Sequence, residues 1–211
     1  MKRKGILVVV SGFSGAGKGT LMEQLLKTYD NYSLSISMTT RAPRPKEQEG
    51  REYFFVTKES FEGEIKQDGL IEYATYCENY YGTPRKYVEE QLNMGKDVIL
   101  EIEIQGALEI KEKFPTALLL FVMPPSAKEL ENRLTKRGTE PPEVIEKRLS
   151  RATEEAQGIE KYDFIVVNDD LESCTRQLHN LITAAHDAPI RNKEFIENMR
   201  QELQALVKGE K

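Results

Sequence analysis

The segment from Gly12 to Thr20 reads GFSGAGKGT and follows the apolar run ILVVV at residues 6–10. Glycines let a loop curl so that successive backbone N–H groups point inward, and a strand before it and a helix after it place those groups at the positive end of the helix dipole. Such a loop is shaped to bind phosphate. Gly12, Gly17 and Lys18 satisfy the pattern GxxxxGK, so the sequence predicts a P-loop whose lysine reaches the outer phosphates of a nucleotide. A flexible glycine turn is the alternative, which the strand-loop-helix context disfavours.

A second candidate anion site lies in the segment SMTTRAPRPKEQEGREY, at residues 37–53. Arg41 and Arg44 are three residues apart on a stretch that two prolines stiffen, which suits two guanidinium groups converging on one phosphate. Tyr53 and Tyr81 add hydroxyl donors. The alternative interpretation is a solvated basic loop.

A third basic group occupies residues 131–152, ENRLTKRGTEPPEVIEKRLSRA. Its arginines bracket the turn GTEPPE between two helix-like stretches, and they are Arg133, Arg137, Arg148 and Arg151. Arginines placed in this way can close over phosphates as a lid that excludes water and supplies charge at the transition state. Any single one of them is as easily a solvated surface residue, so the prediction depends on the set.

The remaining sequence must position these groups, and its pattern alternates. Short β-branched runs occur at 6–10, 97–103, 117–123 and 163–167, with charged, helix-like segments between them. This pattern predicts one α/β domain with a parallel sheet flanked by helices, built from residues 1–35, 90–128 and 151–187. Residues 36–89 differ, with strand-like pieces at 51–56 and 70–76 around a helical stretch at 58–67, which predicts a small inserted mixed α+β subdomain. A helical lid is expected at about 129–150, and a C-terminal helix at about 190–207.

Composition restricts the classes of function. The 211 residues include 30 basic and 35 acidic side chains, for a net charge of −5, which disfavours a nucleic-acid polymer as partner. No stretch is apolar over a length that crosses a bilayer. The two cysteines, Cys77 and Cys174, lack the spacing of a disulfide framework or a zinc site. We therefore expect a cytoplasmic protein with no membrane or nucleic-acid partner. Oligomeric state stays undetermined.

Several motifs together resemble guanylate kinase. They are the P-loop GFSGAGKGT, then SMTTRAPRP, IEYATYCENYYGT, EIEIQGA, RLTKRGTE with KRLSRA, and VVNDDL, in that order, and they cover residues from about 5 to 187. A GTPase is disfavoured because its guanine-reading NKxD is missing: Asn192-Lys193 is followed by Glu194 and Phe195. The resemblance implies a P-loop fold, transfer of the γ-phosphoryl group of MgATP to GMP or dGMP, and Mg²⁺ as cofactor.

The resemblance also implies roles for individual residues. The ATP-binding positions are Gly12, Ser14, Gly15, Ala16, Gly17, Lys18, Gly19, Thr20, Arg133, Arg137 and Asn168. The GMP-binding positions are Ser37, Arg41, Arg44, Glu47, Tyr53, Glu72, Tyr81, Thr83 and Glu103. Catalytic roles fall on Lys18, Arg44, Arg137 and Arg148. Magnesium is assigned to Thr20 and Glu101, directly or through water, because Gly19 stands where a P-loop usually has Ser or Thr.

The chemistry of Glu72 agrees with a guanine acceptor. Guanine presents N1–H and an amino group side by side, so one carboxylate can accept from both, while the hydroxyls of Ser37 and Thr83 donate to O6. Adenine has an acceptor at N1 and would leave a buried Glu72 unpaired. Glu72 alone could equally be an acid at a strand edge; its spacing to YYGT favours the guanine site.

Two positions depart from the family pattern. Met38 stands where a small hydroxyl residue is more usual, and Glu103 where the family usually has Asp. The longer side chain could shift a contact to guanine or to magnesium-bound water. Glu101 and Glu103 could instead be buried strand-end acids that cap the following helix.

Three other functions remain open at this stage. A kinase for another nucleoside monophosphate shares the P-loop and the lid but has no use for Glu72. A non-catalytic scaffold that binds phosphopeptides has no reason to keep Lys18. A ribosyl-phosphate kinase of related architecture would not need the base-reading pair Glu72 and Thr83.

Overall fold

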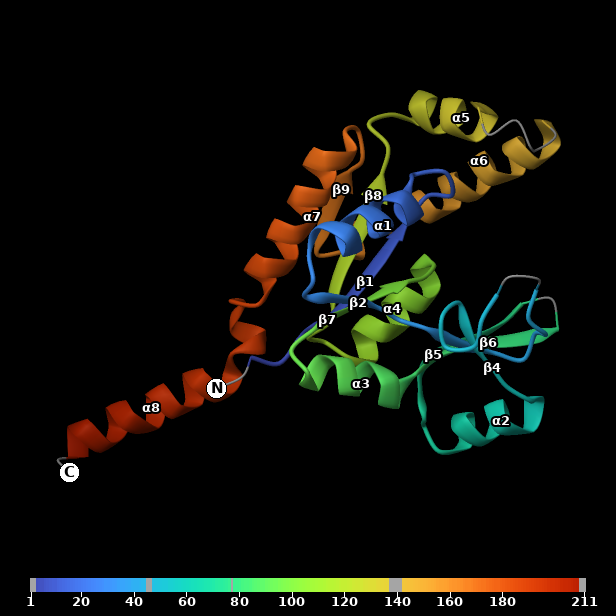
Figure 1. Cartoon of the computed structure of the whole chain (residues 1–211). Helices are drawn as coiled ribbons and strands as arrows, with labels where there is room; N and C mark the ends of the chain where they lie inside the picture. Colours follow the sequence, from blue (N-terminus) through green and yellow to red (C-terminus); the bar gives the residue numbers. More distant parts are fainter. Residues whose placement is uncertain (1–2, 45–46, 77, 137–141, 209–211) are drawn as a thin grey trace.

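The computed structural model describes residues 3–44, 47–76, 78–136 and 142–208. A five-stranded sheet in the order β2-β7-β1-β8-β9 forms its centre (Figure 1). The strands are β1 (Leu7–Gly12), β2 (Tyr32–Leu34), β7 (Asp97–Glu101), β8 (Leu118–Met123) and β9 (Phe164–Val167). All neighbouring strands run parallel. The predicted parallel sheet is confirmed.

β8 is apolar along its whole length, and β1 and β7 are largely apolar between their ends, because helices cover both faces of these strands. Val9 on β1, Ile99 on β7 and Leu119 on β8 are fully buried. Val10 pairs with Glu101, and Gly12 pairs with Val122. The residues that follow β1, β7 and β8 therefore emerge at one edge, the carboxyl edge of the sheet, where open α/β sheets bind ligands.

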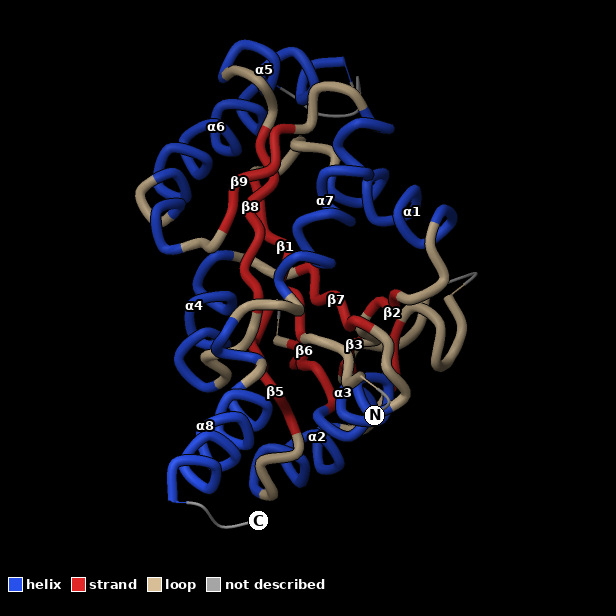
Figure 2. The backbone as a smooth tube through the Cα atoms, turned by 90° about the vertical axis from the view of Figure 1, so that its left-hand side faces the viewer, coloured by secondary structure: helices blue, strands red, loops and turns tan. Residues whose placement is uncertain are grey.

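Helices lie on the two sides of this sheet, as Figure 2 shows. On one side are α1 (Lys18–Thr28) and α7 (Leu171–Ala185), and on the other are α4 (Ile104–Lys113) and α6 (Pro142–Ala156). The inner face of α7 carries Cys174, Leu178 and Ile182, buried and four residues apart, which is the spacing of an amphipathic helix. The helix α3 (Arg85–Asn93) packs against β7.

A second, four-stranded sheet has the order β4-β3-β6-β5. Its strands are β3 (Ser37–Thr39), β4 (Tyr53–Phe55), β5 (Leu70–Tyr76) and β6 (Asn79–Pro84), with α2 (Lys58–Lys66) between β4 and β5 in the chain. Phe61 of α2 is fully buried and its ring stacks on Tyr80, with centroids 5.1 Å apart. These elements all fall inside the range expected for the inserted subdomain.

The remaining elements follow β8. They are α5 (Ala127–Lys136), which packs on α6, the short helices η1 (Ile159–Lys161) and η2 (Pro189–Arg191), and α8 (Lys193–Lys208). Arg137 and the turn at 138–141 lie outside the described residues, as does Cys77. Among the residues described, no helix combines the length and the apolar character needed to cross a membrane.

The strands β2, β3 and β6 were not among the runs that the sequence pattern indicated. β2 and β3 have three residues each, too few for a periodic pattern, and they form by pairing with β7 and with β4 and β6. The strand expected over 97–103 ends at Glu101, because Glu103 is already the N-cap residue of α4 and its carbonyl accepts from the Ala107 amide at 3.0 Å.

Candidate functional site

The P-loop joins β1 to α1 at the carboxyl edge of the central sheet. Lys18 is the first residue of α1, and its Nζ donates to the carbonyl oxygens of Gly12 at 2.8 Å and Phe13 at 3.3 Å. The lysine side chain therefore folds back across the loop. The first turn of α1 contains no acidic residue and Gly17 gives it no side-chain cap, so its backbone N–H groups remain suited to an anion.

Close packing explains two of the glycines in this loop. A Cβ at Gly12 would lie 2.1 Å from the carbonyl oxygen of Val122 on the neighbouring strand. Gly17 has a φ of +87°, which side chains rarely adopt, and a Cβ there would lie 2.6 Å from Nδ2 of Asn168. That Nδ2 donates to the carbonyl of Ala16 at 2.9 Å, and Asn168 is buried. Asn168, the residue that follows β9, thus holds the P-loop in place through this hydrogen bond.

Arginines of α5 and α6 reach the P-loop from the other direction. Nη1 of Arg148 donates to Oγ of Ser14 at 3.0 Å. Arg133 is paired with Glu129 at 2.8 Å, and its Nη1 lies 3.5 Å from the Ala16 carbonyl oxygen. The lid prediction placed both arginines near the phosphates, and the structure brings both to the loop.

A cleft of about 510 Å³ opens in front of this loop. We call it the P-loop cleft; its lining includes Gly12, Ser14, Lys18, Glu101, Glu103, Arg148, Arg151 and Glu155. Glu155 is an acid that sequence reasoning did not select. Its side chain is 15% exposed, and burial raises the pKa of its carboxyl group, which Arg151 opposes. It lies seven residues after Arg148 on α6, two helical turns along the same face, and that spacing was the available signal.

A second cleft, of about 480 Å³, is lined by residues of the four-stranded sheet on one side and of the segment from β7 to α4 on the other. We call it the tyrosine cleft; its lining includes Ser37, Tyr53, Glu72, Tyr73, Tyr81, Gln105 and Glu109. The rings of Tyr53 and Tyr81 meet edge to face, with centroids 5.9 Å apart. Apolar ring faces with hydroxyl and carboxylate groups among them suit a planar, polar-edged ligand such as a nucleobase.

Glu72 is the buried acid of this cleft. Its Oε1 accepts a hydrogen bond from Oγ1 of Thr83 at 2.6 Å, and Thr83 itself is fully buried. Burial raises the pKa of the Glu72 carboxyl group; the Thr83 hydroxyl acts in the opposite direction, and the nearby Glu109 adds to the rise. A desolvated carboxylate held in one orientation discriminates sharply between donors and acceptors on a ligand.

Beside the tyrosine cleft, Arg41 and Glu47 form an ion pair in which one guanidinium nitrogen contacts both carboxylate oxygens. Nη2 of Arg41 lies 2.9 and 3.0 Å from the two carboxylate oxygens, and both side chains are less than one-fifth exposed. The guanidinium lies 5.4 Å from the centroid of the Tyr53 ring. Glu47 also accepts from the backbone amide of Arg44 at 2.7 Å, and these donors hold the pKa of its carboxyl below the usual range. The pair fixes the loop that carries Arg44, whose side chain is exposed.

The two clefts share one wall. Glu101, Ile102 and Glu103, the residues between β7 and α4, line both of them. Glu103 pairs with Nη2 of Arg151 on α6, and Nε of Arg151 lies 3.1 Å from Glu155. Glu103 is two-thirds exposed and makes no capping bond to α4, so the alternative that it is a buried helix-capping acid is wrong.

Comparison with known proteins decides the family. The guanylate kinase family model matches residues 4–185. Among curated proteins, the guanylate kinase of Latilactobacillus sakei is 47% identical over 187 residues, covering 88% of this chain and 92% of that protein. The guanylate kinase of Desulfitobacterium hafniense is 49% identical over 192 residues, covering 91% and 96%. This chain belongs to the guanylate kinase family.

A solved structure agrees with this assignment. The crystal structure of guanylate kinase from Anaplasma phagocytophilum is 33% identical, covers 90% of each chain and superposes with a TM-score of 0.68. Guanylate kinases are ATP:GMP phosphotransferases, so the predicted family, reaction class and α/β fold are confirmed.

Within this family assignment, the structure brings together part of the predicted site. Five of the predicted GMP positions line the tyrosine cleft or both clefts: Ser37, Tyr53, Glu72, Tyr81 and Glu103. Thr83 contacts Glu72, and Arg41 with Glu47 forms the neighbouring ion pair.

The positions predicted for magnesium and for the ATP base are placed differently. Thr20 is exposed on α1 and is not among the residues that line the P-loop cleft, whereas Glu101 lines it. The amide nitrogen of Asn168 bonds to the P-loop, so its contact with the ATP base stays a prediction.

Proposed function

We propose that ATP binds in the P-loop cleft and GMP in the tyrosine cleft, and that the γ-phosphoryl group passes directly between them past the wall that they share. The observation that carries this proposal is that Glu101, Ile102 and Glu103 line both clefts. Two substrates on either side of one short segment can bring donor and acceptor phosphates in line without an intermediate on a side chain. The 5′-phosphate of GMP is ionised near neutral pH, so the reaction needs no strong general base.

Guanine would be read by Glu72, Thr83 and Ser37. The Glu72 carboxylate accepts from guanine N1–H and the 2-amino group, and the hydroxyl of Ser37 donates to O6. In the structure Thr83 donates to Oε1 of Glu72 at 2.6 Å, which orients the carboxylate; Thr83 reaches O6 only if that hydrogen bond is exchanged. None of these contacts involves the sugar 2′-hydroxyl, so dGMP is included as an acceptor.

The acceptor phosphate would be held by the basic loop beside the cleft. Arg41 is already fixed against Glu47 and the Tyr53 ring, which lowers the entropy that it loses on binding. Arg44 lies on the same loop with an exposed side chain, and it can reach a phosphate when this subdomain closes. Tyr53 and Tyr81 supply hydroxyl donors.

Charge on the transferring group would be neutralised from the P-loop side. Lys18 leads α1, and Arg148 contacts the loop through Ser14. Arg133 and Arg137 complete this set in the proposal, although Arg137 lies outside the described residues. We expect the elements 129–150 to act as a lid on ATP and 36–89 to close on GMP, which would exclude water from the reaction.

Mg²⁺ would supply positive charge that reduces the repulsion between the phosphates of the two substrates. The shared wall fits this ion, because Glu101 and Glu103 offer carboxylate oxygens at the P-loop cleft, and Mg²⁺ typically takes one or two carboxylates with waters and phosphates. Thr20 is a second candidate through water. We place the reaction in the cytoplasm with free nucleotides as the substrates.

The test measures ADP formation from MgATP with GMP, dGMP, AMP, CMP, UMP and TMP each as the sole acceptor, and includes Lys18→Ala. Turnover confined to GMP and dGMP that disappears in Lys18→Ala is the expected result. Turnover on another base would overturn the role of Glu72, and phosphopeptide binding with no turnover would favour the scaffold.

A further inference from the structure

Glu155 of α6 is an acid in a cleft that the proposed function fills with phosphate. It lines the P-loop cleft, its side chain is 15% exposed, and burial raises the pKa of its carboxyl group. Withdrawing a carboxylate from water costs free energy, and a carboxylate close to the phosphates of ATP also repels them. Glu155 therefore needs a cationic partner in the cleft.

That partner is Arg151, four residues earlier on α6, the spacing at which side chains of one helix meet. Its Nε donates to Oε1 of Glu155 at 3.1 Å, and its Nη2 pairs with Glu103 on the wall that the two clefts share. One guanidinium group thus links the helix to the wall. Lys18 and Arg148 also line the P-loop cleft, and both contact the P-loop. Arg151 lies at the boundary between the donor and acceptor sites.

The two carboxylates hold Arg151 unequally. The side chain of Glu103 is 67% exposed, whereas that of Glu155 is 15% exposed. Water and salt weaken an exposed ion pair much more than a partly buried one. A phosphate oxygen that competes for Arg151 therefore displaces Glu103 first. Nε then stays on Glu155, and the two Nη groups are left to donate to phosphate oxygens.

We propose that Arg151 is a further catalytic residue, which neutralises the phosphoryl group as it passes the shared wall, and that Glu155 positions it. This inference rests on the proposed function, because it needs ATP in the P-loop cleft and GMP in the tyrosine cleft. The γ-phosphorus forms a bond to an oxygen of the GMP phosphate and breaks its bond to the β–γ bridging oxygen, which leaves on ADP with the electron pair. Arg151 forms no covalent bond. Its Nη groups donate to the oxygens of the group in transit, over which negative charge is spread.

This arrangement predicts losses in kcat. Arg151→Ala removes donors to the group in transit and should lower kcat roughly 100-fold, as the loss of one preorganised donor does. Glu155→Gln leaves the guanidinium without its buried anchor and should lower kcat about tenfold. Both KM values should stay within about twofold, because Arg151 is paired with Glu103 until charge develops on the phosphoryl group. A purely structural role of Glu155 would not separate kcat from KM in this way.

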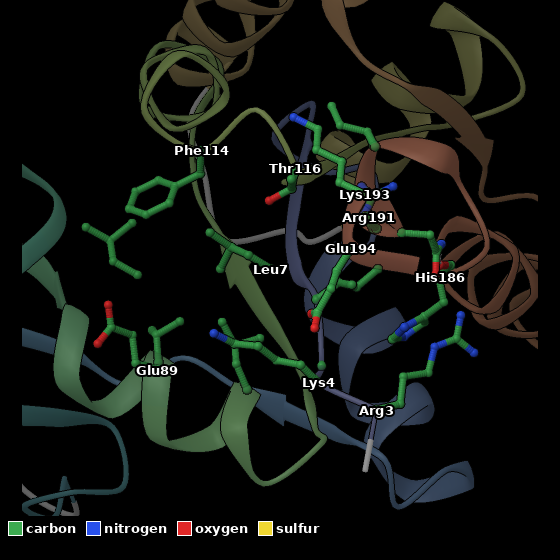
Figure 3. Close-up of a pocket in the computed structure, with 17 residues that line it drawn as sticks. Arg3, Lys4, Leu7, Glu89, Phe114, Thr116, His186, Arg191, Lys193 and Glu194 are labelled. Atoms are coloured by element: carbon green, nitrogen blue, oxygen red, sulfur yellow. Dashed lines mark hydrogen bonds between the residues drawn. The ribbon is translucent and has the colours of Figure 1, made fainter. Parts of the chain in front are cut away.

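Two control variants remove a carboxylate without touching this pair. Glu154→Gln makes the same change at the neighbouring, exposed position of α6, which is not among the residues that line either cleft. Glu89→Gln makes the change at a distance. Figure 3 shows Glu89 beside a separate cavity of about 440 Å³, which shares none of its described lining residues with the two clefts. Each control should change kcat less than about twofold.

The double variant Arg151→Ala/Glu155→Gln distinguishes a positioning role from an independent one. If Glu155 acts through Arg151, removing it has no further cost once the arginine is absent. The double variant should therefore turn over at least about as fast as Arg151→Ala. The assay is steady-state ADP release, with each substrate varied at saturation of the other, on the unaltered chain and on every variant.

The possible contrary results are distinct. Losses that multiply in the double variant would show that Glu155 acts independently of Arg151. A Glu155→Gln variant with unchanged kcat and a lower KM for ATP would show that Glu155 only adds negative charge to the cleft. Normal kcat in Arg151→Ala, beside normal turnover of GMP by the unaltered chain, overturns this inference alone. An unaltered chain that does not turn over GMP overturns the proposed function as well.

Discussion

Replacing Glu72 with Gln tests the base-reading site by exchanging one carboxylate oxygen for an amide nitrogen. The carboxylate is held by the Thr83 hydroxyl at 2.6 Å, and in the proposed complex it accepts both guanine donors. Gln keeps one acceptor oxygen but turns an amide N–H₂ toward the second guanine donor. One charge-assisted hydrogen bond is lost, at a cost of about 1.5–3 kcal/mol.

That cost predicts the kinetics. The ratio kcat/KM for GMP should fall roughly 10- to 150-fold, at about 1.4 kcal/mol per factor of ten. The KM for ATP should be unchanged, because Glu72 lines the tyrosine cleft and not the P-loop cleft. Thermal stability should hold or increase, since burial already disfavours the ionised form of Glu72.

The assay is steady-state ADP release with GMP varied at saturating MgATP, then with MgATP varied at saturating GMP. Glu109→Gln is the matched control, because it removes the charge of another carboxylate that lines the same cleft, while Thr83 donates to Glu72. Its kcat/KM should change less than about twofold. Equal losses in the two variants would refute the reasoning, because the effect would then come from the charge of the cleft. So would an unchanged kcat/KM for GMP in Glu72→Gln.

Three further predictions concern other parts of the site. The KM for GMP should fall as pH rises above 4.5, the ordinary pKa of a Glu carboxyl, because burial raises the pKa of Glu72 and only its ionised form accepts from both guanine donors. A pH profile of KM checks this, and the KM of Glu72→Gln should not change over the same pH range. Asn168→Ala removes the donor to the Ala16 carbonyl and should lower the free energy of unfolding by about 1–3 kcal/mol in urea titration; Asn168→Asp, which also removes the donor, should not rescue it. Glu103→Asp shortens the side chain that pairs with Arg151, so it should lower kcat and leave both KM values near normal. Arg151→Ala should have the same effect. A rise in the KM for GMP alone would show that Glu103 binds guanine instead.

The sequence by itself determined the features that depend on local pattern. Four β-branched runs indicated the parallel strands β1, β7, β8 and β9. The first three runs are apolar because both faces of those strands are largely buried, whereas β9 is an edge strand on which only Val166 is buried. The P-loop was predicted from GxxxxGK, since the backbone geometry of a phosphate loop requires glycine at fixed positions. The ordered set of motifs indicated the family and placed Glu72 at the GMP site, and the match of its acceptors to guanine agrees with that placement.

The tertiary structure decided what depends on contacts between distant segments. The three-residue strands β2 and β3 form only because longer neighbours pair with them. Asn168 and Ala16 are 152 residues apart, so no local pattern shows that the asparagine supports the loop. Likewise, the meeting of Glu103 with Arg151 on α6, and the sharing of one wall by two clefts, arise where the ends of parallel strands converge. A sequence specifies which groups can do chemistry, and the packing of the sheet edge brings them together.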